Sequence, residues 1–371
     1  MYKLTAPCHF GLEKTLSFEM KRAGGDNINV KDGRVDLTGD ERVIAKANIT
    51  SSVAERIGIV LAEFGAKTFD DVFETCRRIP IEQFAASSDK LHIVKGHSLN
   101  SKLTSIPALQ RTIKKALVMR MQEKYKIGQL PETGAVLPIH FLIMKDRMTV
   151  TLDTSGTGLH KRGYRAMSNA APIKETLAAG IVDLARVRPE DTVIDPFCGS
   201  GTILIEAALK AANIAPCLNR RFAAMDWGCI DKKVWTDAAD EARAAIRTDC
   251  GFQALGSDKD AEAVQLTMEN AKIAGVSDHI KVQKRDIKDF HYPQQGAKVI
   301  TNPPYAERMG ELAEAKDIYR TMGKVLLPKG DNSIYVITSV EEFEDLFGEK
   351  ADKNRKLYNG MLMCRLYSYI K

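Results

Sequence analysis

The chain has 371 residues, 44% of them hydrophobic, which is enough to bury the cores of two or three domains. The sequence has no run of about 18 apolar residues, as a membrane-spanning helix needs, and its start lacks the apolar core of a signal peptide. The seven cysteines form no Cys-x-x-Cys pair, so we expect reduced thiols in the cytoplasm, no disulfide framework and no bound metal. A net charge of +6 is mild, and its distribution is more informative than its size.

Residues 1–50 predict a small α+β unit of ferredoxin-like type. An amphipathic helical pattern runs from Gly11 to Arg22 and ends at a pair of glycines, and two short strand-like runs follow. Helical spacing of apolar residues returns after this unit and predicts a further helix from Thr50 to about Glu63.

Residues 51–155 contain a basic helix between predicted strands. Ser105 is suited to cap a helix whose first turn holds Pro107, and apolar residues four apart predict a buried stripe along it. Between residues 90 and 128, nine Lys or Arg residues accompany a single acidic residue. An exposed charged helix face is usually just solvated, but such a bias favours phosphate binding. We therefore expect contacts with RNA from Lys102, Arg111, Lys114 and Lys115. Two strands, 136–144 and 148–153, close this segment.

A linker follows at residues 156–170, and a last domain at residues 171–371. The linker is basic and punctuated by glycine, which indicates a domain boundary. We include three of its residues among the expected RNA contacts: Lys161, Arg162 and Arg165. A helix with Pro172 near its start opens the last domain.

A glycine turn is the centre of the last domain. The apolar run 191–194 predicts a buried strand, and Asp195-Pro-Phe-Cys-Gly-Ser-Gly-Thr202 leads from it into a helix. Open α/β sheets bind nucleotide-like ligands at such turns. Thr202 stands where a phosphate-binding loop has lysine, and Leu204 stands where the dinucleotide fingerprint has its third glycine. A tight strand-to-helix connection is the structural alternative.

A second stretch, Asn302-Pro-Pro-Tyr305, follows the predicted strand 298–301. Two consecutive prolines remove two backbone donors and impose an extended path, so the segment cannot continue a sheet. The rigid path would fix the Asn302 amide and the Pro303 carbonyl as acceptors beside the Tyr305 ring.

In their order and spacing, these two stretches resemble motifs I and IV of the class I, S-adenosylmethionine-dependent methyltransferases that modify exocyclic amines of bases. The resemblance implies an α/β, Rossmann-like sheet of seven strands that ends in an antiparallel hairpin. Asn359-Gly360, between two strand-like runs, is a strong hairpin signal. Lys350, Lys353, Arg355 and Lys356 give this hairpin region a second basic patch.

The resemblance also assigns the cofactor, S-adenosyl-L-methionine, and its binding residues. In the glycine turn these are Asp195, Pro196, Phe197, Gly199, Gly201 and Thr202. A carboxylate closing the second strand can accept hydrogen bonds from ribose hydroxyls, and Asp258 is the first choice for it, with Asp260 second. Asp286 matches the residue that accepts from the adenine amine. We expect Asp260 or Asp258 to cap the next helix as well. Glu175 and Thr176 match a cofactor-closing turn, although the sequence favours a place on a helix surface for both.

The catalytic residues that the resemblance implies are Asn302, Pro303, Pro304 and Tyr305. The segment 51–155 resembles a THUMP domain, an RNA-binding module, and its position before this core favours an RNA guanine-N2 methyltransferase acting on 23S rRNA. Some such enzymes are fused to a second methyltransferase half, whereas this sequence ends at Lys371. A tRNA guanine-N2 enzyme, an adenine-N6 enzyme and a non-catalytic RNA-binding protein with a degenerate fold remain as alternatives. We expect no membrane partner, and the sequence indicates no particular protein partner.

Overall fold

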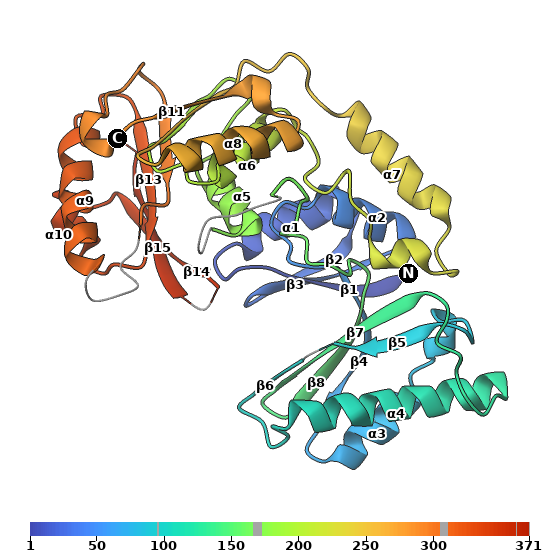
Figure 1. Cartoon of the computed structure of the whole chain (residues 1–371). Helices are drawn as coiled ribbons and strands as arrows, with labels where there is room; N and C mark the ends of the chain where they lie inside the picture. The colour runs from blue at the N-terminus through green and yellow to red at the C-terminus, as the bar shows by residue number, and fades with distance from the viewer. Residues whose placement is uncertain (95, 166–172, 305–310, 361, 371) are drawn as a thin grey trace.

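The computed structural model describes the chain except residues 95, 166–172, 305–310, 361 and 371 (Figure 1). Its described strands form two sheets, each with helices packed against it. Among the described residues, no helix combines the length and hydrophobicity that crossing a bilayer requires. Within these described residues, no group of three or more His, Cys, Asp or Glu side chains is placed to hold a metal ion.

The first sheet runs from the chain start to residue 153, in the order β2-β3-β1-β4-β8-β7-β5, with β6 beside β7. Its strands are β1 (Tyr2–Pro7), β2 (Asp26–Lys31), β3 (Arg34–Gly39), β4 (Gly58–Gly65), β5 (Lys90–Ile93), β6 (His97–Leu99), β7 (Val136–Met144) and β8 (Arg147–Asp153). Its helices are α1 (Glu13–Arg22), α2 (Glu41–Thr50), α3 (Phe69–Arg77) and α4 (Ile106–Tyr125). In Figure 1, α3 and α4 form the outer layer of a lobe set apart from α1 and α2.

The helix expected from Thr50 to Glu63 is wrong. The structure places α2 earlier, at Glu41–Thr50, where the Asp40 carboxylate accepts hydrogen bonds from the backbone N–H groups of Arg42 and Val43 at 3.0 and 3.1 Å. Strand β4 then pairs along its length with β8. Pairing in the sheet and β-branched residues therefore outweigh the helical spacing of this segment.

The second sheet has seven described strands in the order β11-β10-β9-β12-β13-β15-β14. The bounds are β9 (Thr192–Asp195), β10 (Gln253–Asp258), β11 (Ile280–Lys284), β12 (Lys298–Thr301), β13 (Ser333–Thr338), β14 (Lys353–Asn359) and β15 (Leu362–Tyr369). All neighbours are parallel except those of β15, which is antiparallel to β13 and β14. The predicted seven-stranded sheet with a terminal hairpin is confirmed.

Helices cover both faces of this second sheet (Figure 1). They are α5 (Glu175–Leu184), α6 (Thr202–Ala211), α8 (Ala261–Ile273), α9 (Glu311–Leu326) and α10 (Phe343–Phe347). Helix α7 (Lys232–Ala244) packs against α2 instead. Alternate strand residues enter separate cores, since Val193 joins the core on the α5 and α6 side and Ile194 the core on the α9 and α10 side. The first of these cores continues into the ferredoxin-like unit, where Leu12 packs on Gly180 of α5. The contact is so close that a Cβ on Gly180 would lie 2.2 Å from Leu12 Cδ1.

Candidate active site

The glycine turn and the Asn-Pro-Pro segment leave neighbouring strands at the same edge of the second sheet. Strands β9 and β12 are parallel, with Val299 opposite Ile194. Their last residues are joined directly, because the Thr301 hydroxyl donates a hydrogen bond of 2.7 Å to Asp195 Oδ1. Two segments about a hundred residues apart in the sequence are thus brought together in one site, as expected.

The Asp195 carboxylate supports the turn from inside the protein. It is 2% exposed and also accepts a hydrogen bond of 3.1 Å from the Phe197 N–H. Burial raises the pKa of Asp195 to about 7, although the bond from Thr301 opposes the shift. The Thr301 hydroxyl and the Phe197 N–H both donate to Oδ1 of Asp195, so this residue fixes the turn that contains Pro196 and Phe197.

Both glycines of the turn have a positive φ, a backbone conformation that favours glycine. Gly199 has φ +53° and open space where a Cβ would stand, so the backbone there can approach a ligand. Gly201 has φ +80°, and a Cβ would lie 2.6 Å from Thr267 Cγ2 of α8. Helix α8 holds the turn, since Thr267 Oγ1 donates to Gly199 O at 2.8 Å and Asn270 donates to Ser200 O at 2.9 Å.

Three carboxylates lie at the ends of the two strands beyond β9. Asp258 ends β10, and its two oxygens accept from the N–H groups of Gly199 and Asp260, each at 3.0 Å. Asp260 caps α8 through the N–H of Glu262, also at 3.0 Å. Asp286 follows β11 and accepts from the Lys288 N–H at 3.1 Å. The capping role expected for one carboxylate therefore belongs to Asp260, which leaves Asp258 beside the glycine turn.

The Asn-Pro-Pro segment is tied to the sheet by a tyrosine. Pro303 is buried, Asn302 is half-buried and Pro304 is exposed. The Tyr319 hydroxyl of α9 donates to Pro304 O at 3.0 Å and lies 2.9 Å from Thr338 Oγ1 at the end of β13. Tyr305, expected to complete the segment, lies outside the described residues. The Tyr319 hydroxyl thus anchors the end of this three-residue segment to α9 and β13.

Glu175 and Thr176 are buried, which corrects the expectation that they lie on a helix surface. Helix α5 is covered by the ferredoxin-like unit, and the Thr176 hydroxyl donates to Glu55. Burial would raise the pKa of Glu55, but hydrogen bonds from His9 and Thr176 hold it well below its usual range. Thr176 therefore joins α5 to the segment that precedes β4. Burial also raises the pKa of Glu175.

Arg165 links the linker to the start of α6. Its guanidinium donates to Thr202 Oγ1 at 2.6 Å and to Ile173 O at 3.1 Å, and it forms an ion pair of 3.6 Å with Glu175. The side chain is largely enclosed, so its predicted RNA contact is replaced by a role in holding the residue that follows the glycine turn.

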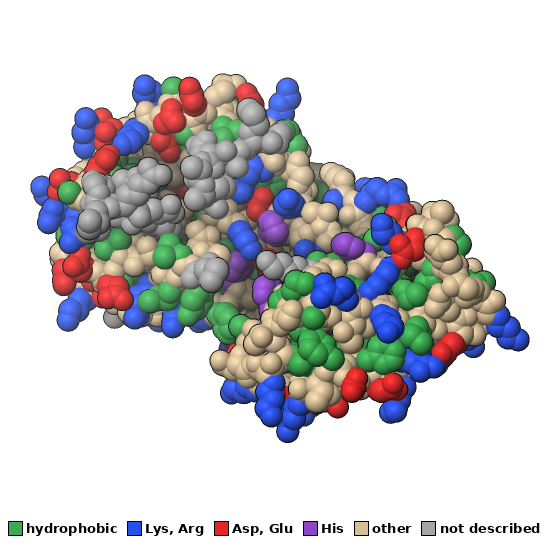
Figure 2. All heavy atoms as spheres, turned by 60° about the horizontal axis from the view of Figure 1, so that its bottom comes forward, with side chains coloured by type: hydrophobic (Ala, Val, Ile, Leu, Met, Phe, Trp, Pro, Cys, Tyr) green, Lys and Arg blue, Asp and Glu red, His purple; other side chains and the backbone are tan. Residues whose placement is uncertain are grey.

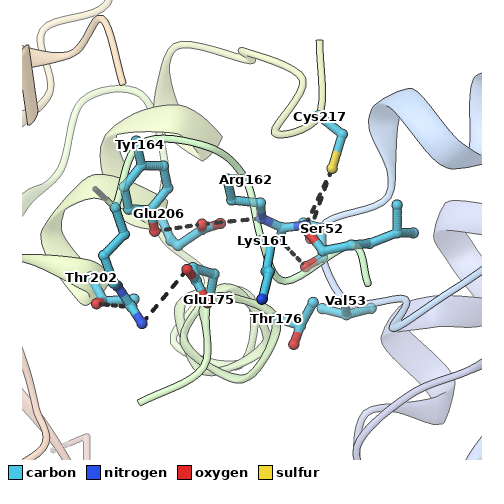
Figure 3. Close-up of polar contacts among 12 residues, drawn as sticks. Ser52, Val53, Lys161, Arg162, Tyr164, Glu175, Thr176, Thr202, Glu206 and Cys217 are labelled. Carbon is cyan, nitrogen blue, oxygen red and sulfur yellow. Dashed lines mark hydrogen bonds and ion pairs between the residues drawn. The ribbon is translucent and has the colours of Figure 1, made fainter. Parts of the chain in front are cut away.

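Arg162 is likewise an interior residue, so its predicted RNA contact is wrong. Its side chain is 1% exposed, forms an ion pair of 3.3 Å with Glu206 of α6, and donates to backbone carbonyls of Ser52 and Leu159 (Figure 3). Burial disfavours the charged guanidinium, but Glu206 outweighs this effect and raises the pKa of Arg162. Tyr164 donates to the same carboxylate at 3.0 Å. A glutamate within the apolar run of α6 was the sequence signal for this buried pair.

The expected basic surface on α4 is reduced by carboxylates outside the basic stretch. Lys114 donates to Leu91 O at 2.6 Å and pairs with Glu132, so it is not a free surface charge. Lys115 is exposed and lies 5.7 Å from the Phe73 ring centre. The exposed cations among the remaining predicted contacts are Lys102, Arg111 and Lys161.

The sheet order, the glycine turn and the adjoining Asn-Pro-Pro segment define a class I methyltransferase. The open backbone at Gly199 and the carboxylate at the end of β10 fit an adenosyl cofactor. The family model described as "RMKL-like, methyltransferase domain" matches residues 162–368, and one described as "RlmL ferredoxin-like domain" matches residues 3–58. The chain belongs to this methyltransferase family, and its cofactor is S-adenosylmethionine.

Individual relatives cover nearly the whole chain. YpsC of Bacillus subtilis, provisionally named an RNA methyltransferase, is 40% identical over 370 residues, covering 99% of this chain and 96% of that protein. "Ribosomal RNA large subunit methyltransferase K/L" of Syntrophotalea carbinolica is 32% identical over 390 residues, which are 99% of this chain and 53% of that protein. The chain thus spans about half the length of the K/L protein.

Solved structures agree with this membership. A possible methylase from Clostridium difficile 630 is 42% identical with a TM-score of 0.95, covering 99% of this chain and 97% of that chain. SMU.472, described provisionally as a methyltransferase and solved with S-adenosylhomocysteine, is 36% identical with a TM-score of 0.93 over 99% of this chain and 97% of that chain.

Proposed function

We propose that the protein transfers the methyl group of S-adenosylmethionine to the exocyclic N2 amine of a guanine in RNA, with 23S rRNA as the substrate. The observation that carries this proposal is the direct join between Thr301 and Asp195, which sets the Asn-Pro-Pro segment beside the glycine turn. The names of YpsC and of the K/L relatives, which refer to RNA and to ribosomal RNA, support the choice of substrate.

An exocyclic guanine amine is a poor nucleophile because its lone pair is drawn into the ring. The Asn302 side-chain oxygen and the Pro303 carbonyl would accept the two amine hydrogens and turn the lone pair outward. The bound cofactor supplies an electrophilic methyl group on a sulfonium. Asp258 would hold the ribose, Asp286 the adenine, and the backbone at Gly199 and Gly201 the remainder. The protein contributes mainly positioning and electrostatics.

The N-terminal half would deliver the RNA. We assign a ferredoxin-like unit to residues 1–50, a THUMP module to 51–155, a linker to 156–170 and the methyltransferase domain to 171–371. Figure 2 shows a hollow between two lobes, in which histidine side chains gather and which lysine and arginine side chains border. The target base would have to leave its helix to reach the acceptors, so an unpaired or flipped guanine is expected.

Adenine N6 is the second candidate, because an Asn-Pro-Pro segment serves either purine amine. A Listeria monocytogenes structure at 41% identity and a TM-score of 0.93 is named, by prediction, as an N6-adenine-specific DNA methylase. The front half, with its exposed cations, favours RNA. A tRNA guanine is the remaining substrate alternative, and a non-catalytic protein would bind the cofactor without turnover on any RNA.

Replacing Asn302 with Ala tests the proposed function. The variant should bind S-adenosylmethionine with unchanged affinity in calorimetry, because Asn302 faces the base in this scheme. Transfer of labelled methyl groups to rRNA from a strain lacking the protein should fall by at least about a hundredfold. Near-normal turnover in the variant would show that another group orients the amine.

A further inference from the structure

Strand β14 carries a basic segment that the proposed chemistry does not use. Lys353, Arg355 and Lys356 are exposed on this strand, which forms an edge of the second sheet. A basic edge strand is often a device against aggregation. Here, the neighbours of the segment indicate a more specific role.

The register of the sheet places the last residues of β14 at the end of the sheet that carries the active site. Lys356 pairs with Arg365 of β15, and Arg365 pairs with Thr338, which ends β13 and contacts Tyr319. Since β15 is antiparallel to both neighbours, β14 runs parallel to β12 and β13. Tyr358 lies two residues beyond Lys356, toward the end of the sheet where Asn302 follows β12. Three strand spacings of about 4.8 Å separate β14 from β12, or roughly 14 Å in total.

An aromatic pair from two domains lies at this end of β14. Phe10, in the loop between β1 and α1, is 51% exposed, and its ring centre lies 5.8 Å from that of Tyr358. The rings are tilted by 59°. Lys356 Nζ lies 5.4 Å from the centre of the Tyr358 ring, so a cation adjoins the pair.

The loop that carries Phe10 is fixed in place. Gly11 has φ +91°, and a Cβ on it would lie 2.8 Å from Lys356 O, so only glycine allows this approach to β14. Arg355 Nη1 donates to Gly11 O at 2.9 Å. Glu13 accepts from the N–H groups of Gly11 and Gly33 at 2.9 and 3.0 Å. The exposed ring therefore sits on a built support.

We propose that Phe10, Tyr358 and Lys356 form a stacking site for an unpaired RNA base near the target nucleotide, with the Lys356 ammonium beside the adjacent phosphate. This inference rests on the proposed RNA substrate. The exposed Phe10 ring and the half-buried Tyr358 ring beside the Lys356 cation match a base and its phosphate, and stacking of one base contributes about 1–3 kcal/mol. A partner strand from another protein fits less well, because the Gly11 loop covers the β14 edge at Lys356.

Binding of a single-stranded RNA oligonucleotide that carries 2-aminopurine tests this site, because stacking on an aromatic ring quenches that base. Phe10→Ala and Tyr358→Val should each weaken binding about tenfold and reduce the quenching. Tyr358→Phe should retain both. Phe18→Ala is the matched control, since Phe18 is a 54% exposed phenylalanine on α1, and it should bind like the wild type. Unchanged calorimetric affinity for S-adenosylmethionine would show that each variant is folded.

Wild-type affinity and quenching in both Phe10→Ala and Tyr358→Val would overturn the stacking site. The same weakening in Phe18→Ala would also overturn it, because the effect would not depend on the pair. Failure of the proposed function has a different signature: the wild type would bind and quench the probe but transfer no methyl group to rRNA.

Discussion

Asp258 and Asp260 are separated by one residue but have different partners. Asp258 accepts from the glycine turn, whereas Asp260 caps α8. Asp258→Ala should weaken binding of S-adenosylmethionine about ten- to a hundredfold, because it removes hydrogen bonds to a charged group. Asp260→Ala is the matched variant and should cost about 1 kcal/mol of stability with little effect on that affinity.

Calorimetry and chemical denaturation of these two variants measure both quantities. An unchanged cofactor affinity in Asp258→Ala, together with a weaker one in Asp260→Ala, would transfer the ribose contact to Asp260.

At the scale of elements, Arg162 joins the N-terminal half of the chain to α6, because it contacts both Ser52 and Glu206. Arg162→Met would leave the Glu206 carboxylate buried without its cation, so the free energy of unfolding should fall by about 3–5 kcal/mol. Arg162→Met with Glu206→Gln removes the buried charge while keeping an acceptor for Tyr164, and it should recover most of the stability. Urea denaturation measures both. A surface-like change below about 0.5 kcal/mol in Arg162→Met would contradict the interior role.

Local signals predicted the second sheet well. Strand β12 has the bounds 298–301 that the sequence predicts, and the Asn359-Gly360 hairpin is present. The predicted helix after Thr50 failed because its residues pair with β8, a partner far along the chain. Arg162 looked like a solvated linker charge for the same reason. Its carboxylate partner lies 44 residues away, and only the fold brings the two together.

At the scale of the whole molecule, RNA affinity should depend on the exposed cations and not on Lys114. Replacing both Arg111 and Lys115 with Ala should lower RNA affinity for all sequences and flatten its salt dependence by about one unit for each phosphate that the variant no longer neutralises. Lys114→Ala is the control. Its amine is held by Leu91 O and Glu132, so the salt slope should stay unchanged.

Fluorescence anisotropy at several salt concentrations gives these slopes. The same slope for the wild type and the double variant would make that face of α4 an ordinary solvated surface.

The most direct test is to identify the methylated nucleoside. RNA from a strain lacking the protein is incubated with the purified chain and labelled S-adenosylmethionine, and its nucleosides are separated by mass spectrometry. We expect labelled N2-methylguanosine from 23S rRNA with the wild type and none with Asn302→Ala. Label in N6-methyladenosine, or in no nucleoside, would contradict a site in which Asn302 and Pro303 present a guanine amine to the methyl donor.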